Sequence, residues 1–93
     1  MTAPDWRPPA KRSLTIQGHR TSVSLEPAFW DGFRALAARR GMALNALAVE
    51  IDAARPPDVG LATAIRLSVL GDLTAQLADH PMVPSTGNAS SNQ

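Results

Sequence analysis

The sequence predicts a mainly α-helical domain with a short β-ribbon. Apolar and polar residues alternate over 13–16 and 21–25, which is typical of strands with one buried face. Further along, apolar residues recur every three or four positions in three stretches, which is typical of amphipathic helices. The chain has 93 residues, of which 44% are hydrophobic and 18% are charged. This length and composition predict one small folded domain.

The β part of the sequence has two possible arrangements. Gly18 lies between the two alternating segments, and a glycine supplies the positive φ that a tight turn needs, so Gly18-His19 is a candidate two-residue hairpin turn. The same residues also fit one irregular strand interrupted at Gly18. Under either arrangement the second segment has a buried face, with Thr21, Val23 and Leu25, and an exposed face, with Arg20, Ser22 and Ser24.

The first helix has recognisable start and stop signals. Pro27 suits the first helical position, and Leu25 and Trp30 have the spacing of a hydrophobic staple. Arg39 and Arg40 favour the carboxyl end of a helix, and Gly41 is a natural residue just beyond it. These signals predict a helix of about fourteen residues that begins at Glu26-Pro27.

Two more helices are expected after Gly41. The second covers about 43–54 and is ended by Pro56-Pro57. The third covers about 61–79, and its interior Gly71 costs about 1 kcal/mol relative to alanine, so tertiary contacts are expected to hold it. We interpret its apolar stripe as core or dimer packing, with a docking helix for a partner protein as the other interpretation. The stripe consists of Leu61, Ile65, Val69, Leu73 and Leu77.

Prolines and charge divide the chain into three parts. Residues 1–12 form a proline-containing basic arm expected to be flexible, residues 13–80 the folded domain, and residues 81–93 a tail expected to be disordered. Residues 1–20 carry a formal charge of +3, whereas residues 56–93 carry −2. A partner with phosphates would therefore meet the amino-terminal fifth of the chain.

Several function classes are excluded by composition. The chain has no cysteine and its two histidines match no ligand pattern, so we expect no disulfide, metal or other cofactor. No nucleophile or phosphate-binding motif is present, so we expect no catalysis. We also expect no secretory leader and no membrane span, and hence a soluble cytoplasmic protein.

Self-association follows from an estimate of the core. The large apolar side chains of the ribbon segment and the first two helices are too few to order one copy, and a lone strand has two unpaired edges. We therefore predict a homodimer whose shared core contains Val23, Leu25, Trp30, Phe33, Leu36, Leu44, Leu47 and Ile51.

The order of these elements resembles the ribbon-helix-helix family. The resemblance is carried by Arg20-Thr-Ser-Val-Ser-Leu25, by Glu26-Pro-Ala-Phe-Trp30 and by Gly41-Met-Ala-Leu-Asn-Ala-Leu47. Lys11-Arg-Ser, Gly18-His-Arg and Leu61-Ala-Thr-Ala-Ile-Arg66 resemble a bacterial subgroup with an extra carboxyl-terminal helix. The likeness covers residues 11 to about 78.

The resemblance implies a homodimer that reads the major groove of double-stranded DNA with a two-stranded ribbon, as a transcriptional repressor or regulator. It places Ser or Thr near position 43, where this chain has Ala43. A dimerisation or protein-interaction module with little DNA binding is the alternative, because the total charge is only +1. The implied base contacts are Arg20, Ser22 and Ser24, and the implied phosphate contacts are Lys11, Arg12, Ala43, Leu44 and Asn45.

Overall fold

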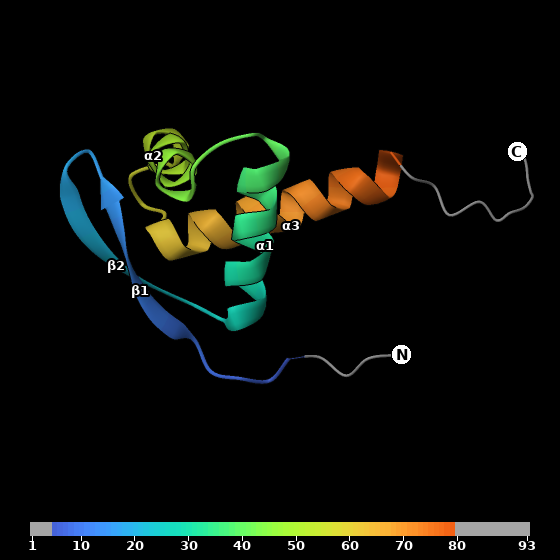
Figure 1. Cartoon of the computed structure of the whole chain (residues 1–93), viewed down its shortest axis with the longest axis horizontal. Helices are drawn as coiled ribbons and strands as arrows, with labels where there is room; N and C mark the ends of the chain where they lie inside the picture. Colours follow the sequence, from blue (N-terminus) through green and yellow to red (C-terminus); the bar gives the residue numbers. More distant parts are fainter. Residues whose placement is uncertain (1–4, 80–93) are drawn as a thin grey trace, which may run out of the picture.

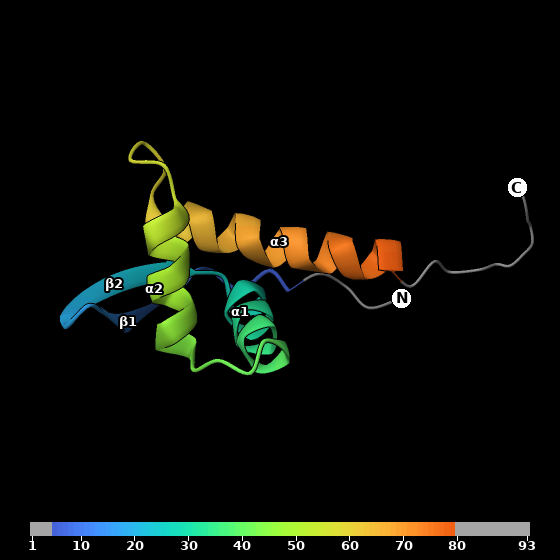
Figure 2. The same cartoon turned by 90° about the horizontal axis from the view of Figure 1, so that it is seen from above.

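A computed structural model describes residues 5–79, which form a hairpin followed by three helices. The hairpin lies at one end of the molecule with the helices on one side of it, and α3 runs on past α1 (Figures 1 and 2). The predicted tail, 81–93, lies outside the described residues, and the last three residues of the predicted arm belong to β1. The elements are β1 (Ala10–Ile16), β2 (His19–Leu25), α1 (Pro27–Arg39), α2 (Leu44–Ala54) and α3 (Leu61–Asp79).

The β-ribbon is an antiparallel hairpin within one chain. β1 pairs with β2 from Ile16 opposite His19 to Ala10 opposite Leu25. The turn residues are Gln17 and Gly18, with φ of 50° and 81°. The turn expected at Gly18-His19 is therefore wrong by one residue. The alternative arrangement, one irregular strand, is also wrong. A tight turn with two left-handed residues matches the twist of the strands, and glycine at its second position is the common arrangement.

The ends of α1 follow from local chemistry. Glu26 precedes the helix and Pro27 occupies its first turn. Gly41, at φ 65°, donates from its N–H to the carbonyl of Ala38 at 3.1 Å, and Met42 donates to that of Ala37 at 2.9 Å. These two bonds form a Schellman motif, which satisfies carbonyls that the helix leaves unpaired.

The hydrophobic core is closed by a single chain. β1 contributes Leu14 and Ile16, and α3 contributes Ile65 and Val69. Seven of the eight side chains expected in a shared dimer core are buried here within one copy, and Leu44 is partly buried. The estimate behind the predicted homodimer did not include β1 and α3, whose side chains complete this core within one copy. β1 also gives β2 its strand partner.

Two close contacts fix α1 against its neighbours. A Cβ atom at Gly32 would lie 2.6 Å from Cγ1 of Val69, so α1 and α3 approach where α1 has no side chain. The indole Nε1 of Trp30 donates a hydrogen bond of 2.8 Å to the carbonyl of Ala10. Trp30 is thus buried with its polar atom satisfied, and it anchors the start of β1 to α1.

Candidate nucleic-acid interface

The face of the hairpin that points away from the helices is polar. Directly opposed residues of an antiparallel pair lie on the same face. The register therefore places Lys11 with Ser24, Ser13 with Ser22, and Thr15 with Arg20. All six side chains are exposed, and they comprise two cations and four hydroxyls with no carboxylate. We call this surface the outer face: Lys11, Ser13, Thr15, Arg20, Ser22 and Ser24.

The cations that are not in ion pairs gather on the hairpin. The chain has nine lysines and arginines, all within the described residues. The three without an ion pair in that part of the chain, Lys11, Arg12 and Arg20, lie on β1 or β2. The uncompensated positive charge is therefore concentrated at the ribbon. The paired arginines are Arg7, Arg34, Arg39, Arg40, Arg55 and Arg66.

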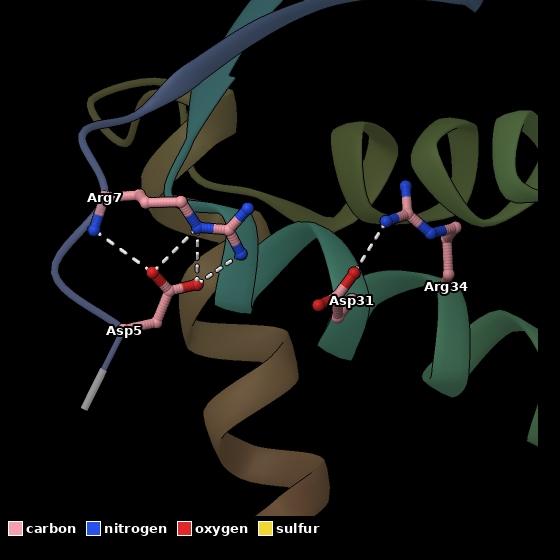
Figure 3. A network of polar contacts seen from close by, with 4 residues as sticks. All are labelled: Asp5, Arg7, Asp31 and Arg34. Atoms are coloured by element: carbon pink, nitrogen blue, oxygen red, sulfur yellow. Dashed lines mark hydrogen bonds and ion pairs between the residues drawn. The ribbon is translucent and has the colours of Figure 1, made fainter. Parts of the chain in front are cut away.

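Arg7 shows how this charge is neutralised elsewhere. Its Nε lies 2.9 Å from Oδ1 of Asp5 and its Nη2 lies 2.7 Å from Oδ2, which makes a two-pronged contact (Figure 3). The hydrogen bonds from Arg7 lower the pKa of Asp5 to about 2. Asp31 and Arg34 form a further pair on α1 (Figure 3). Because Asp5 neutralises Arg7, this part of the basic arm adds no net positive charge.

The structure separates the two neighbouring cations of β1. Lys11 lies on the outer face, whereas Arg12 lies opposite Val23 on the face toward the helices. The guanidinium of Arg12 lies over the ring of Trp30, 5.6 Å from its centroid. A cation over an indole face is stabilised by the ring quadrupole. Of the two phosphate contacts implied for β1, only Lys11 shares a face with Arg20.

Each edge of the hairpin has outward backbone groups, and hydrogen bonds to the rest of the chain satisfy different groups on the two edges. Ile16 and His19 close the turn, so the outward N–H and C=O groups belong to the alternate pairs that contain Arg20, Ser22 and Ser24 on β2. On the β1 edge, the N–H of Thr15 donates to Oδ1 of Asn45 at 3.1 Å. On the β2 edge, the carbonyl of Ser24 accepts from Arg66 at 3.3 Å.

Around Arg20 and Ser22 the β2 edge is open. Within residues 5–79, no backbone hydrogen bond reaches the outward N–H or carbonyl of either residue. An edge with unpaired backbone groups is a template for another strand. β2 can therefore accept a further strand, whereas α2 already holds part of β1.

The amino terminus of α2 contains three of the implied phosphate contacts, Ala43, Leu44 and Asn45. Ala43 precedes the helix without a side-chain cap, and the first turn contains no acidic residue. Leu44 is half-buried, and Asn45 uses its amide oxygen for β1. The remaining donors here are backbone N–H groups and the NH₂ of Asn45. Unpaired N–H groups at a helix start attract anions, so the end of α2 keeps this property without a hydroxyl at position 43.

Ser13 and Thr15 are two residues of the outer face that sequence reasoning did not include among the contact residues. Both lie there because the hairpin pairs them with Ser22 and Arg20. The alternation over 13–16 indicates that Ser13 and Thr15 are exposed. It does not show which residues of 20–25 lie opposite them, because that depends on whether a hairpin forms.

These observations first define a class: a small helical domain with an exposed, cationic two-stranded ribbon. The chain belongs to the ribbon-helix-helix domain family, whose model matches residues 9–73. Domains of this family are typically non-catalytic and DNA-binding, and they generally dimerise.

A solved structure supports the fold independently. An uncharacterized protein from Bordetella pertussis Tohama I matches with a TM-score of 0.63 and 26% sequence identity. The match covers 83% of this chain and 63% of the Bordetella chain. No match was found among the curated proteins.

The described residues contain neither a metal site nor a membrane-spanning helix. Within 5–79, no three His, Cys, Asp or Glu side chains gather in a way that could hold a metal ion. In the same part of the chain, no helix has the length and apolar character to cross a membrane.

Proposed function

We propose that two copies of this chain form a DNA-binding homodimer that regulates transcription in the cytoplasm, reading the major groove with the outer face of the ribbon. The observation that carries the proposal is the placement of Lys11, Arg12 and Arg20. These cations lack ion pairs within the described chain, they all lie on the hairpin, and two of them share an exposed face with hydroxyls and no carboxylate. Such a surface is complementary to phosphates and to base edges.

Arg20 is the principal base-reading residue in this proposal. A guanidinium forks onto O6 and N7 of guanine, and such a contact is worth about 1–3 kcal/mol of discrimination. Ser22 and Ser24 donate or accept and discriminate weakly. The major groove, about 12 Å wide, admits a two-stranded ribbon.

Phosphate contacts are assigned to Lys11 and to the start of α2, through the backbone N–H groups after Ala43 and the NH₂ of Asn45. Lys11 lies directly opposite Ser24, at the end of the outer face away from the turn. Arg12 is assigned a packing role on Trp30 instead of the phosphate contact implied by the family resemblance.

The proposed dimer uses the open edge of β2. Two copies of β2 related by a two-fold axis pair antiparallel, and Ser22 faces Ser22 of the partner subunit if the axis passes there. Its outward N–H and carbonyl suit it for this pairing. The two outer faces then join into one four-stranded surface with both Arg20 side chains on it. The dimer is thus required to double the reading surface, not to bury the core.

A salt titration of DNA binding tests the function. Fluorescence anisotropy with a labelled random duplex should show an affinity that falls steeply with salt, because phosphate contacts release counterions. Arg20→Ala should weaken binding, whereas Arg34→Ala, which removes the same charge from an exposed ion pair on α1, should have little effect. No binding at about 50 mM salt would favour the protein-interaction module instead.

The dimer interface has its own matched pair of variants. Ser22→Pro removes an outward N–H from β2 and leaves the β1–β2 hydrogen bonds intact, since proline is tolerated where the N–H faces away from the ladder. Ser13→Pro makes the same change on the β1 edge, opposite Ser22. Light scattering should show that Ser22→Pro prevents pairing through β2 and that Ser13→Pro does not. The reverse result would assign the dimer to β1.

A further inference from the structure

The two strands of the hairpin present different chemistry on the outer face. β2 contributes Arg20, whose guanidinium matches the edge of guanine. β1 contributes Lys11 and the hydroxyls of Ser13 and Thr15, and no arginine. A lysine ammonium binds phosphate as a point charge, and serine and threonine hydroxyls also bond phosphate oxygens. The outer face of β1 therefore carries groups suited to the DNA backbone, whereas β2 carries the group best suited to a base edge.

In the proposed dimer, β1 lies on the outside of a four-stranded sheet. Pairing through the open edge of β2 places the two copies of β2 in the middle and one copy of β1 on each side. Neighbouring strands lie about 4.8 Å apart, so about 5 Å separates the two copies of β2 and about 14 Å separates the two copies of β1. The two strands of each hairpin therefore lie at different distances from the two-fold axis.

This sheet is too wide and too twisted to enter one major groove as a whole. The groove is about 12 Å wide, which admits two strands. The copies of β1 lie further apart than that width, and a twist of about 20–25° between neighbouring strands turns them by about 60–75° relative to each other. Only the two copies of β2 can therefore follow the groove. The copies of β1 then lie over its two walls, where the phosphates are.

A hydrogen bond on the far side of β1 agrees with this order of elements. The N–H of Thr15 donates to Oδ1 of Asn45 at 3.1 Å, so the start of α2 borders β1 on the edge away from β2. The proposed function uses the start of α2 for phosphate and β2 for bases. β1 lies between the two, so an outward path from the two-fold axis passes from base-reading groups to phosphate-binding groups.

We propose that Ser13 and Thr15 join Lys11 in binding the DNA backbone on each wall of the groove, and that β2 alone reads the bases. We call these three residues the β1 phosphate site. Ser13 lies opposite Ser22 at the middle of the ribbon, and Thr15 lies opposite Arg20. The inference rests on the proposed function and deepens it, because it separates the contacts that position the protein from the contacts that carry sequence information.

Matched variants on the two strands test the β1 phosphate site. Ser13→Ala/Thr15→Val removes both hydroxyls of β1 from the outer face and keeps a β-branched residue at position 15. Ser22→Ala/Ser24→Ala removes both hydroxyls of β2 from the same face. All four side chains are exposed, so circular dichroism should show the wild-type fold in both variants. Fluorescence anisotropy then measures binding to two duplexes, a random one and one that the wild-type chain selects from a randomised library.

The two variants should change the two affinities differently. Ser13→Ala/Thr15→Val should weaken binding to both duplexes by the same factor, about 2- to 10-fold for each hydroxyl–phosphate bond lost, and leave the ratio of the two affinities unchanged. Ser22→Ala/Ser24→Ala should lower that ratio, because contacts to base edges are lost. Neither variant removes a charge, so both should keep the salt slope of the wild-type chain.

The opposite results separate this inference from the proposed function. If Ser13→Ala/Thr15→Val lowers the ratio, β1 reads bases, and if it leaves both affinities unchanged, β1 lies away from the DNA. Either result overturns the β1 phosphate site and leaves DNA binding standing. A wild-type chain without salt-dependent binding to the random duplex would instead contradict the proposed function itself.

Discussion

The guanidinium of Arg12 lies over the indole of Trp30, 5.6 Å from the ring centroid, while the adjacent Lys11 belongs to the opposite face of the ribbon. Two successive cations of β1 therefore have different surroundings. The pleat of a strand requires this, because consecutive side chains point to opposite faces. One cation packs on the helical side, and the other is free to meet a ligand.

The first prediction compares the two cations by stability and by DNA binding. Arg12→Ala should lower the free energy of unfolding by about 0.5–1 kcal/mol, the value of an exposed cation–π contact, with little change in the salt dependence of binding. Lys11→Ala should leave stability unchanged and reduce the salt slope by about 1 for each phosphate that Lys11 neutralises. Urea denaturation and anisotropy measure the two effects. Equal reductions in affinity would contradict the separation of faces.

Asn45 allows a test of whether it holds β1 or also faces phosphate. Asn45→Ala should cost about 0.5–1.5 kcal/mol of stability, because the N–H of Thr15 is then without its acceptor. Asn45→Asp keeps an acceptor and adds a negative charge that a helix start favours, so stability should be retained. The same charge should weaken DNA binding if the start of α2 faces phosphate. A stable Asp variant with unchanged affinity would remove α2 from the interface.

The ion pair of Glu26 and Arg66 predicts part of the pH dependence of stability. The hydrogen bond from Arg66 holds the pKa of Glu26 below its ordinary value. A lowered carboxyl pKa stabilises the fold above the unfolded value, about 4.3 for Glu, and this stability is lost as the pH falls through the folded pKa. Glu26→Gln should therefore flatten the decline of stability in acid, measured by urea denaturation from neutral pH to about pH 3. The control is Asp5→Asn, which removes the other carboxyl with a lowered pKa and lies in the exposed arm. It shows how much of the decline in acid comes from the arm.

Two glycines should respond to alanine with opposite signs. Gly32→Ala forces a methyl against Val69 at 2.6 Å and should destabilise the chain by about 1–3 kcal/mol, because α1 and α3 must move apart. A Cβ atom at Gly71 would meet no other atom within 4 Å. Gly71→Ala should therefore stabilise the chain by about 0.5–1 kcal/mol through helix propensity. Thermal denaturation of both variants measures the difference, and a stabilising Gly32→Ala would contradict the close contact.

The helices could be predicted because their signals are local. The bounds of α3 agree with the expected 61–79, and Pro27 and Gly41 mark the ends of α1 as expected. The sequence around Gly18 does not distinguish a hairpin from one irregular strand, because one glycine fits both. The turn at Gln17-Gly18 depends on the pairing of β1 with β2, a contact between segments that no single window of sequence contains.

The alternation that exposes Arg20, Ser22 and Ser24 can be recognised from the order of residues alone, since a strand turns every second side chain to the same face. The helix limits and the family resemblance can be recognised in the same way. Three further features appear only when the folded elements pack together: Arg12 lies over Trp30 and not on the cationic face, Asn45 holds the edge of β1, and β1 and α3 complete the core of one chain. These three facts depend on which elements meet in space. Packing between elements distant in sequence decides that, and local periodicity does not record it.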